Sequence, residues 1–277
     1  PSTILQSQKE SWNKFSTGWG KWDDFTMRFL QPQGEAVLSA FELRDGARVL
    51  DVASGTGDPG LTLASRTRTV EVTALDASEG MLQIAREKSE ALALNNFLTV
   101  VGDACALDFE DQRFDAVSCR LGLMFFPDPQ QAAREMARVL RPGGVLAATV
   151  WAAPSYNPWL TTFMGLLGKH VELPSPPPGS PGLFRCAAPD DLPALLGRAG
   201  LQVEKTKLLQ GHMPCDSSEQ YWKFMNDVVP PIVAALRDAS AELSSAVKAD
   251  VLEALGDLSL AAPESLAWGA HWVVGRK

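Results

Sequence analysis

Short apolar runs and longer amphipathic stretches alternate between Ala47 and about Val150. Five runs rich in Val, Leu, Ala and Thr are short enough to be buried strands. These runs cover residues 48–53, 70–75, 97–101, 115–119 and 145–150. The stretches between them repeat apolar residues at helical spacing. This alternation is typical of βαβ units and predicts a parallel sheet with helices on both faces.

Two of the intervening helices have clear boundaries in the sequence. One is predicted over residues 78–94, where Ser78 is a candidate N-cap and apolar residues recur on one face. The other is predicted over 130–140 and is closed by Arg141-Pro142-Gly143-Gly144. Proline and glycine stop a helix, so this segment predicts a tight turn into the next strand.

The segments outside this block are less regular. Trp12, Trp19 and Trp22 give the N-terminal stretch an aromatic character that suits a core or a lid. Seven prolines between positions 154 and 181 interrupt the strand-helix rhythm and predict an inserted cap or loop. Beyond it, the pattern predicts a helix over 189–200, a sixth strand over 202–210, a helical tract over 217–255 and a final strand over 265–275. The fold class expected is therefore a doubly wound α/β fold with a mostly parallel seven-stranded sheet.

Composition and charge narrow the function classes. The chain has 277 residues, 45% of them hydrophobic, and can bury a full-sized core. A formal charge of −8 repels a phosphate backbone, so a nucleic-acid partner is not expected. The N-terminus lacks the apolar run of a signal peptide, and no run of about twenty apolar residues predicts membrane insertion. The four cysteines show no metal-binding spacing, so we expect no metal and a cytoplasmic protein with reduced thiols.

The strongest chemical signal directly follows the first predicted strand, in the segment Asp51-Val52-Ala53-Ser54-Gly55-Thr56-Gly57-Asp58-Pro59-Gly60. Glycine is needed where the chain turns sharply and a ligand touches the backbone, so Gly55 and Gly57 are candidate contacts. The spacing Gly55-x-Gly57-x-x-Gly60 also matches the dinucleotide fingerprint. Asp51 argues against that reading, because a carboxylate repels a pyrophosphate and suits a cationic ligand.

The segment Asp51–Gly57 resembles motif I of class I S-adenosylmethionine-dependent methyltransferases, in particular the ubiquinone and menaquinone C-methyltransferase-like group (methyltransferase type 11). Ala53 stands where many members carry a first glycine, and quinone-methylating members tolerate alanine there. The later motifs of the family resemble Leu75-Asp76-Ala77-Ser78 with Met81-Leu82, Gly102-Asp103-Ala104, residues 114–120 with 122–126, and residues 138–144. Together these segments cover residues 47–151.

The resemblance implies that the cofactor is S-adenosyl-L-methionine and the product S-adenosyl-L-homocysteine. It implies that Asp76 accepts hydrogen bonds from both ribose hydroxyls and that Met81 lines the adenine, whose edge faces Asp103 and Ala104. The cofactor site expected on these grounds comprises Asp51, Ala53, Gly55, Gly57, Asp76, Ala77, Met81, Gly102, Asp103, Ala104, Cys119 and Arg120.

The expected organisation has four parts. An N-terminal helical lid covers residues 1–46 and the cofactor-binding core 47–151, with cap or substrate-binding elements at 152–187 and 214–260 and the rest of the core sheet at 188–213 and 261–277. By analogy with the family, Trp12, Trp19 and Trp22, with Met124, would line a pocket for a planar apolar acceptor. His170 and His212 flank the cap and are weak candidates for a general base, whereas His271 lies inside the final strand.

The leading hypothesis is methyl transfer to the oxygen, nitrogen or carbon of a small, largely apolar or aromatic acceptor, in natural product or quinone-type biosynthesis. The first alternative is a protein of the same fold that binds S-adenosylmethionine without transferring its methyl group, because the sequence reveals no catalytic base. A less favoured alternative is an NAD-dependent oxidoreductase. The sequence determines neither the acceptor nor the oligomeric state.

Overall fold

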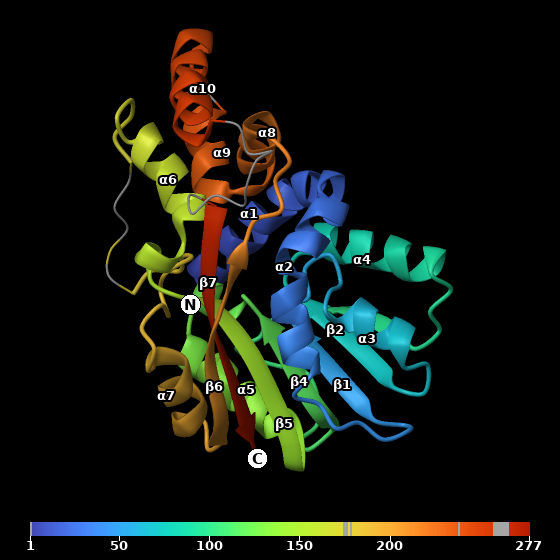
Figure 1. Ribbon diagram of the computed structural model, residues 1–277. Coiled ribbons are helices and arrows are strands. Elements are labelled where there is room, and N and C mark those ends of the chain that lie inside the picture. Colours follow the sequence, from blue (N-terminus) through green and yellow to red (C-terminus); the bar gives the residue numbers. More distant parts are fainter. Residues whose placement is uncertain (1, 174–176, 178, 238, 257–265) are drawn as a thin grey trace.

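The fold is built around one mostly parallel sheet. We describe a computed structural model, in which all residues are described except 1, 174–176, 178, 238 and 257–265. Within the described residues, seven strands pair in the order β3-β2-β1-β4-β5-β7-β6 (Figure 1). They are β1 (Arg48–Val52), β2 (Glu71–Asp76), β3 (Phe97–Val101), β4 (Phe114–Arg120), β5 (Leu140–Trp151), β6 (Gln202–His212) and β7 (Ala267–Arg276). Strands β1 to β5 pair in parallel and β7 is antiparallel to both neighbours, which confirms the predicted fold class.

Helices cover both faces of this sheet (Figure 1). One face carries α2 (Asp23–Leu38), α3 (Gly60–Arg66) and α4 (Glu79–Ala91), and the other carries α5 (Pro129–Val139) and α7 (Asp191–Arg198). Ser78 accepts a hydrogen bond from the amide of Met81 and so forms the N-cap predicted for α4. The central strand β1 is buried on both faces, as parallel strands between helical layers are.

The predicted turn before β5 is wrong in its position. Helix α5 ends at Val139 and β5 begins at once at Leu140, so residues 141–144 belong to the strand. Pairing with the C-terminal residue extends the strand there, because Gly143 N donates to the carbonyl of Lys277 and Lys277 N donates to Gly144 O. Gly143 has a φ of +76°, which bends the chain without ending the pairing.

The predicted helical tract over 217–255 is divided into three helices. They are α8 (Ser218–Val228), α9 (Pro230–Leu236) and α10 (Ala241–Leu255). Val229 is extended and two prolines follow it; a proline has no amide to continue a helix and restricts the residue before it. Of the predicted last strand, Ser265 lies outside the described residues.

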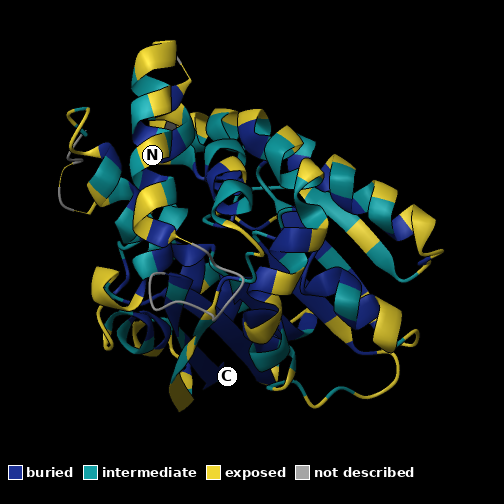
Figure 2. Ribbon diagram, turned by 45° about the horizontal axis from the view of Figure 1, so that its top comes forward, coloured by how far each residue is buried: buried dark blue, intermediate teal, exposed yellow. Residues whose placement is uncertain are grey.

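The cap elements pack as part of the main core. They comprise η2 (Pro154–Tyr156), α6 (Pro158–Leu167), α8, α9 and α10, which gather beyond the end of β5 and the start of β7 (Figure 1). One hydrophobic cluster runs from Leu50 and Val117 in the sheet to Phe163 and Tyr221 in these helices. Buried positions therefore continue from the sheet into the cap (Figure 2). None of the described helices has the length and apolar character to span a membrane.

The N-terminal segment is helical, as predicted. Helix α1 (Ser2–Lys21) packs against α4 on one side and α8 on the other, and so lies across the carboxyl ends of the parallel strands (Figure 1). Close approach to α4 depends on small residues, because a Cβ on Gly80 would lie 2.8 Å from Ser16 Oγ. Helix α2 turns an apolar stripe containing Phe25, Phe29 and Val37 toward the sheet.

Candidate functional site

The glycine-rich loop between β1 and α3 leaves its backbone accessible at one position. Gly55 has a φ of +53°, and no described atom lies within 4 Å of a Cβ built there. Gly57 also has a positive φ, but its Cβ would lie 2.4 Å from Leu61 Cδ1 and 3.1 Å from Ala85 Cβ. Gly55 therefore has room for a ligand beside its backbone, whereas Gly57 is required for the packing of α3 and α4.

Two non-glycine residues with left-handed backbone follow adjacent strands. Ala53, after β1, has a φ of +56°, and Leu121, after β4, has a φ of +60°. Such a conformation costs an L-residue on the order of 1 kcal/mol and concentrates at functional sites. Gly122 is needed beside them, since its Cβ would lie 2.6 Å from that of Ala53. Ala53, the position at which the family resemblance predicts a first glycine in many members, thus has a left-handed backbone.

Asp51 is a buried carboxylate beneath the loop. Its Oδ1 accepts from Ser118 Oγ at 2.7 Å and its Oδ2 from the amide of Gly60 at 3.0 Å. Burial raises the pKa of Asp51 to about 7, although both hydrogen bonds oppose the change. Gly60 is the first residue of α3, so a carboxylate already occupies the helix start that a pyrophosphate would need. This arrangement argues against the dinucleotide alternative.

Asp76 connects the ends of β1 and β2. Its Oδ2 accepts from Gly55 N at 2.9 Å and its Oδ1 from Ser78 N at 2.9 Å. Burial raises the pKa of Asp76, and the backbone hydrogen bonds act in the opposite direction. A carboxylate oxygen has more than one acceptor position, so both oxygens retain capacity for ligand hydroxyls. Met81 is buried in the first turn of α4, close to this strand end.

The end of β3 continues the same edge. Gly102 N donates to the carbonyl of Asp76 at 3.0 Å, and a Cβ on Gly102 would lie 2.8 Å from Leu75 Cδ1. Asp103 Oδ1 accepts from the amide of Cys105, and Ala104 is buried. The structure therefore brings together the predicted residues of the first three strands, with Ala77 between Asp76 and the α4 cap.

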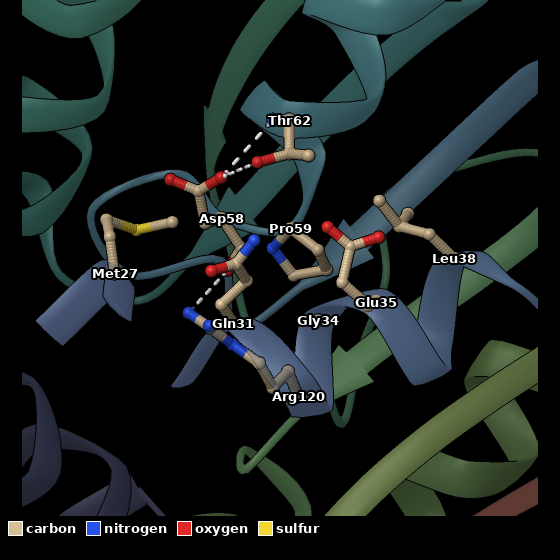
Figure 3. A pocket seen from close by; sticks show the side chains of 9 residues that line it. All are labelled: Met27, Gln31, Gly34, Glu35, Leu38, Asp58, Pro59, Thr62 and Arg120. Carbon is tan, nitrogen blue, oxygen red and sulfur yellow. Dashed lines mark hydrogen bonds between the residues drawn. The ribbon is translucent and has the colours of Figure 1, made fainter. Parts of the chain in front are cut away.

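Cys119 and Arg120 end β4 but point to opposite faces of the sheet, as successive strand residues do. Cys119 lies in the main hydrophobic cluster, and burial raises its pKa to about 12. Its thiol is therefore a packing group and not a nucleophile. Arg120 lies with α2 and the start of α3 at a small surface pocket, where its Nη2 donates to the carbonyl of Asp58 at 2.9 Å (Figure 3). The prediction that Cys119 and Arg120 border the cofactor stays a prediction, with their two side chains on different faces of the sheet.

The N-terminal tryptophans divide into two groups. The ring of Trp12 lies 5.1 Å from Phe125, in the short helix η1 (Leu123–Phe125) after β4, and 6.2 Å from Trp19. The Nε1 of Trp19 is buried and has no hydrogen-bond partner among the described residues. Trp22 instead packs against Phe224 of α8, and its Nε1 donates to Asp227. Trp12 thus lies beside η1, which also contains the buried Met124, and Trp19 lies next to Trp12, while Trp22 attaches α1 to the cap.

The candidate histidines lie away from these strand ends. His170 follows α6, and its Nε2 lies 2.9 Å from Asp250 Oδ2 of α10. His212 is the exposed last residue of β6 and pairs in register with Ala267. Among the described contacts, none joins either histidine to the predicted cofactor residues, so their role as a base stays a prediction. The Nε2 of His271 lies 3.0 Å from the carbonyl of Ala187, in keeping with a structural role.

Two polar residues at the site had no signal in the sequence. Asn13 Oδ1 on α1 accepts from Ser78 Oγ at 2.8 Å and from Gly80 N at 3.0 Å, at the start of α4. Lys88 lies on an ordinary helix, yet its Nζ reaches the loop after β1. Both residues make their contacts with segments that are distant in the sequence. The spacing of residues along the chain therefore could not predict these contacts.

Comparison with known proteins agrees with this geometry. Residues 49–144 match the family model of a methyltransferase domain. The demethylmenaquinone methyltransferase of Listeria welshimeri is 38% identical over 144 residues, which cover 52% of this chain and 56% of the relative. That of Staphylococcus aureus is 40% identical over 120 residues, covering 43% and 49%. The chain therefore spans about half the length of the curated relatives it matches.

Solved structures share the fold over most of the chain. A Bacillus halodurans protein assigned as a methyltransferase gives a TM-score of 0.59 at 22% identity, covering 89% of this chain and 99% of its own. The cyclase SpnF gives a TM-score of 0.56 at 23% identity, covering 89% and 80%. At these identities the likeness shows the fold alone.

The order of the motifs, the order of the strands and the domain match lead to one assignment. The matched region begins within β1 and ends within β5, so it contains the four strand ends described above. The predicted methyltransferase domain is confirmed for residues 49–144, and S-adenosylmethionine is the cofactor that such a domain implies. Residues 49–144 of this chain match a methyltransferase domain, and over this region the chain is similar to demethylmenaquinone methyltransferases.

Proposed function

We propose that this chain transfers the methyl group of S-adenosylmethionine to a small, planar, largely apolar acceptor held beneath α1. The observation that carries the proposal is the connected edge formed by Gly55, Asp76 and Gly102. One hydrogen bond joins Gly55 to the Asp76 carboxylate, and another joins Gly102 to the Asp76 carbonyl. The three strand ends therefore present room, a carboxylate and backbone groups at one place.

The residues present fit this cofactor. The space beside Gly55 would be reduced by any Cβ, and the neighbouring Ser54 has a buried hydroxyl with no partner among the described residues. Asp76 would bind the ribose diol, because one carboxylate can accept hydrogen bonds from two adjacent hydroxyls. When bound, the cofactor supplies an electrophilic methyl group on a cationic sulfonium. The anionic side chains around the loop suit that positive charge.

The work of the protein in such a reaction is alignment and exclusion of water. Methyl transfer is an in-line displacement, so its rate depends on holding donor and acceptor in the correct geometry. Helix α1 lies over the strand ends and contacts both α4 and α8. The rings of Trp12 and Phe125 would give a flat acceptor apolar surface on this side.

The buried indole of Trp19 suggests a polar atom on the acceptor. A buried N–H without a partner is costly, on the order of 1–3 kcal/mol, unless a ligand or water completes it. An acceptor oxygen, as in a phenol, quinol or quinone, would accept this hydrogen bond. The names of the curated relatives support a quinone-type acceptor, and this choice belongs to the proposal.

Titration and turnover together test the proposal. Calorimetric titration with S-adenosylmethionine and with NADH should show micromolar binding of the former alone, whereas dinucleotide binding alone would overturn the assignment. Formation of S-adenosylhomocysteine should then be measured with a panel of quinols, phenols and amines. SpnF is named a cyclase, so the shared fold does not fix the reaction. Cofactor binding without product across the panel would favour the alternative that does not transfer methyl groups.

A further inference from the structure

Three charged side chains from three separate elements meet beside the cofactor loop. Lys88 Nζ on α4 lies 2.9 Å from Asp23 Oδ2, at the start of α2, and 3.1 Å from Asp58 Oδ2, in the loop after β1. The lysine side chain is 22% exposed, that of Asp23 20% and that of Asp58 5%. We refer to Asp23, Lys88 and Asp58 as the charge bridge.

The charge bridge is tied to the residues around Gly55. Thr56, the next residue in the loop, donates from Oγ1 to Asp23 Oδ1 at 3.1 Å. Asp58 Oδ1 accepts from both the amide and the hydroxyl of Thr62, at 3.2 and 2.6 Å (Figure 3). The start of α2 is thus attached directly to the loop whose backbone faces the cofactor.

The same contact fixes α1. Helix α1 ends at Lys21 and α2 begins at Asp23, so little chain separates the charge bridge from α1. Farther along α1, Asn13 accepts from the first turn of α4. The helix above the strand ends is therefore held at Asn13 and, through Asp23, at its carboxyl end.

Lys88 compensates two carboxylates that are largely removed from water. Arg120 is a second positive charge near Asp58 and Asp23, but its described hydrogen bond here goes to the Asp58 carbonyl and not to either carboxylate. Without Lys88, Asp23 and Asp58 would lose the cation that is paired directly with both, in a partly buried site, which is unfavourable. Loss of Lys88 should therefore loosen the start of α2 and the cofactor loop together.

We infer that Lys88 is a positioning residue that couples the N-terminal helices to the cofactor loop. Cofactor binding at Gly55 would stabilise the placement of α1 through Asp23, and the placement of α1 would raise cofactor affinity by the same factor, because coupling is reciprocal. The inference rests on the proposed function for the identity of the cofactor. The physical link between α2 and the loop stands without it.

Hydrogen exchange on the cofactor-free protein tests the link directly. In Lys88→Met, amides of residues 12–30 and of residues 53–60 should both exchange faster than in the unaltered protein. Arg86→Met is the matched control, because Arg86 lies on the same helix and pairs with the exposed Glu79, away from the loop. Lys88→Arg should restore protection. Unchanged exchange, or a change confined to one of the two segments, would overturn the coupling.

Cofactor affinity provides the second readout. We expect Lys88→Met to weaken S-adenosylmethionine binding about tenfold, within the usual range of allosteric coupling, and Arg86→Met to leave it unchanged. If Lys88→Met does not fold, Asp23→Ala cuts the link from the start of α2 to both Lys88 and Thr56, and the same results are expected. Failure of the unaltered protein to bind the cofactor would overturn the proposed function, while the exchange result would still decide the coupling.

Discussion

The two sides of the site are built by different means. The cofactor side consists of residues that follow three strands directly and are linked by hydrogen bonds through Gly55, Asp76 and Gly102. The proposed acceptor side consists of aromatic side chains from α1 and η1, with an indole N–H that has no described partner. The first is a set of hydrogen-bonded residues at strand ends, whose positions follow from the local sequence. The second is a packed aromatic surface, formed by segments that are distant in the sequence. The cofactor side should therefore respond to loss of single charges and the acceptor side to changes in shape.

The largest expected effect is the pH dependence of stability that the buried carboxyl group of Asp51 should cause. Burial raises the pKa of Asp51 from 3.8 to about 7, so the folded protein holds a proton that the unfolded chain releases near pH 4. The contribution of Asp51 to stability should fall by about 4 kcal/mol as pH rises from 4 to 7 and stay constant above that. Asp51→Asn cannot ionise and should lack this fall.

Urea denaturation of both proteins between pH 4 and 8 isolates the effect of Asp51. The free energy of unfolding of Asp51→Asn is subtracted from that of the unaltered protein at each pH. The contributions of all other titrating groups, which the two proteins share, then cancel. A difference that does not change with pH would contradict the raised pKa.

The next effect concerns ligand binding by the same framework. Asp76→Ala removes the carboxylate proposed to bind the ribose and should weaken S-adenosylmethionine binding by one to two orders of magnitude, about 1.5–3 kcal/mol. Glu79→Ala is a suitable control, because Glu79 is an exposed carboxylate in the first turn of α4. Calorimetry measures both. An unchanged dissociation constant in Asp76→Ala would count against the assigned role.

A smaller effect is expected on the acceptor side. Trp19→Phe keeps an aromatic ring but removes the indole N–H, and should lower kcat/KM for an oxygen-bearing acceptor about fivefold, the equivalent of one neutral hydrogen bond. The S-adenosylmethionine dissociation constant should not change. Trp12→Phe is the matched control, because the Trp12 ring packs on Phe125 and its N–H is not among the buried groups without partners. Equal losses in the two variants would remove the assigned role of the Trp19 N–H.

The difference between the two sides also explains what the sequence could predict. Strands and the residues at their ends depend on local hydrophobic pattern and turn chemistry, so the sequence predicted that Gly55, Asp76 and Asp103 lie at or after the ends of three strands, as they do in the structure. Two secondary-structure predictions were wrong. Residues 141–144 were predicted as a turn but belong to β5, because they pair with the C-terminal residue. The helix predicted over 217–255 is interrupted at Val229, because two prolines follow it. The role of Lys88 depends on three segments meeting in space, which no spacing encodes.

Arg120 is an instructive exception, because the necessary information was in the sequence. Side chains alternate along a strand, so Cys119 and Arg120 could not both point in the same direction. The family motif predicts that both residues border the cofactor, and strand geometry adds that their two side chains lie on different faces of the sheet. Motif resemblance locates a backbone segment, and the strand period decides which of its side chains can face the ligand.

The smallest expected effect concerns the histidines and decides whether the acceptor side includes a base from the cap. His170 pairs with Asp250 on α10, and His212 is exposed at the end of β6. A general base must lie within hydrogen-bond reach of the proton it removes, or reach it through one water. His170→Gln and His212→Gln should therefore each change kcat by less than about twofold, because a catalytic base contributes about a hundredfold or more. A hundredfold loss in either variant, with cofactor affinity retained, would place that histidine at the acceptor and require the cap to move toward α1.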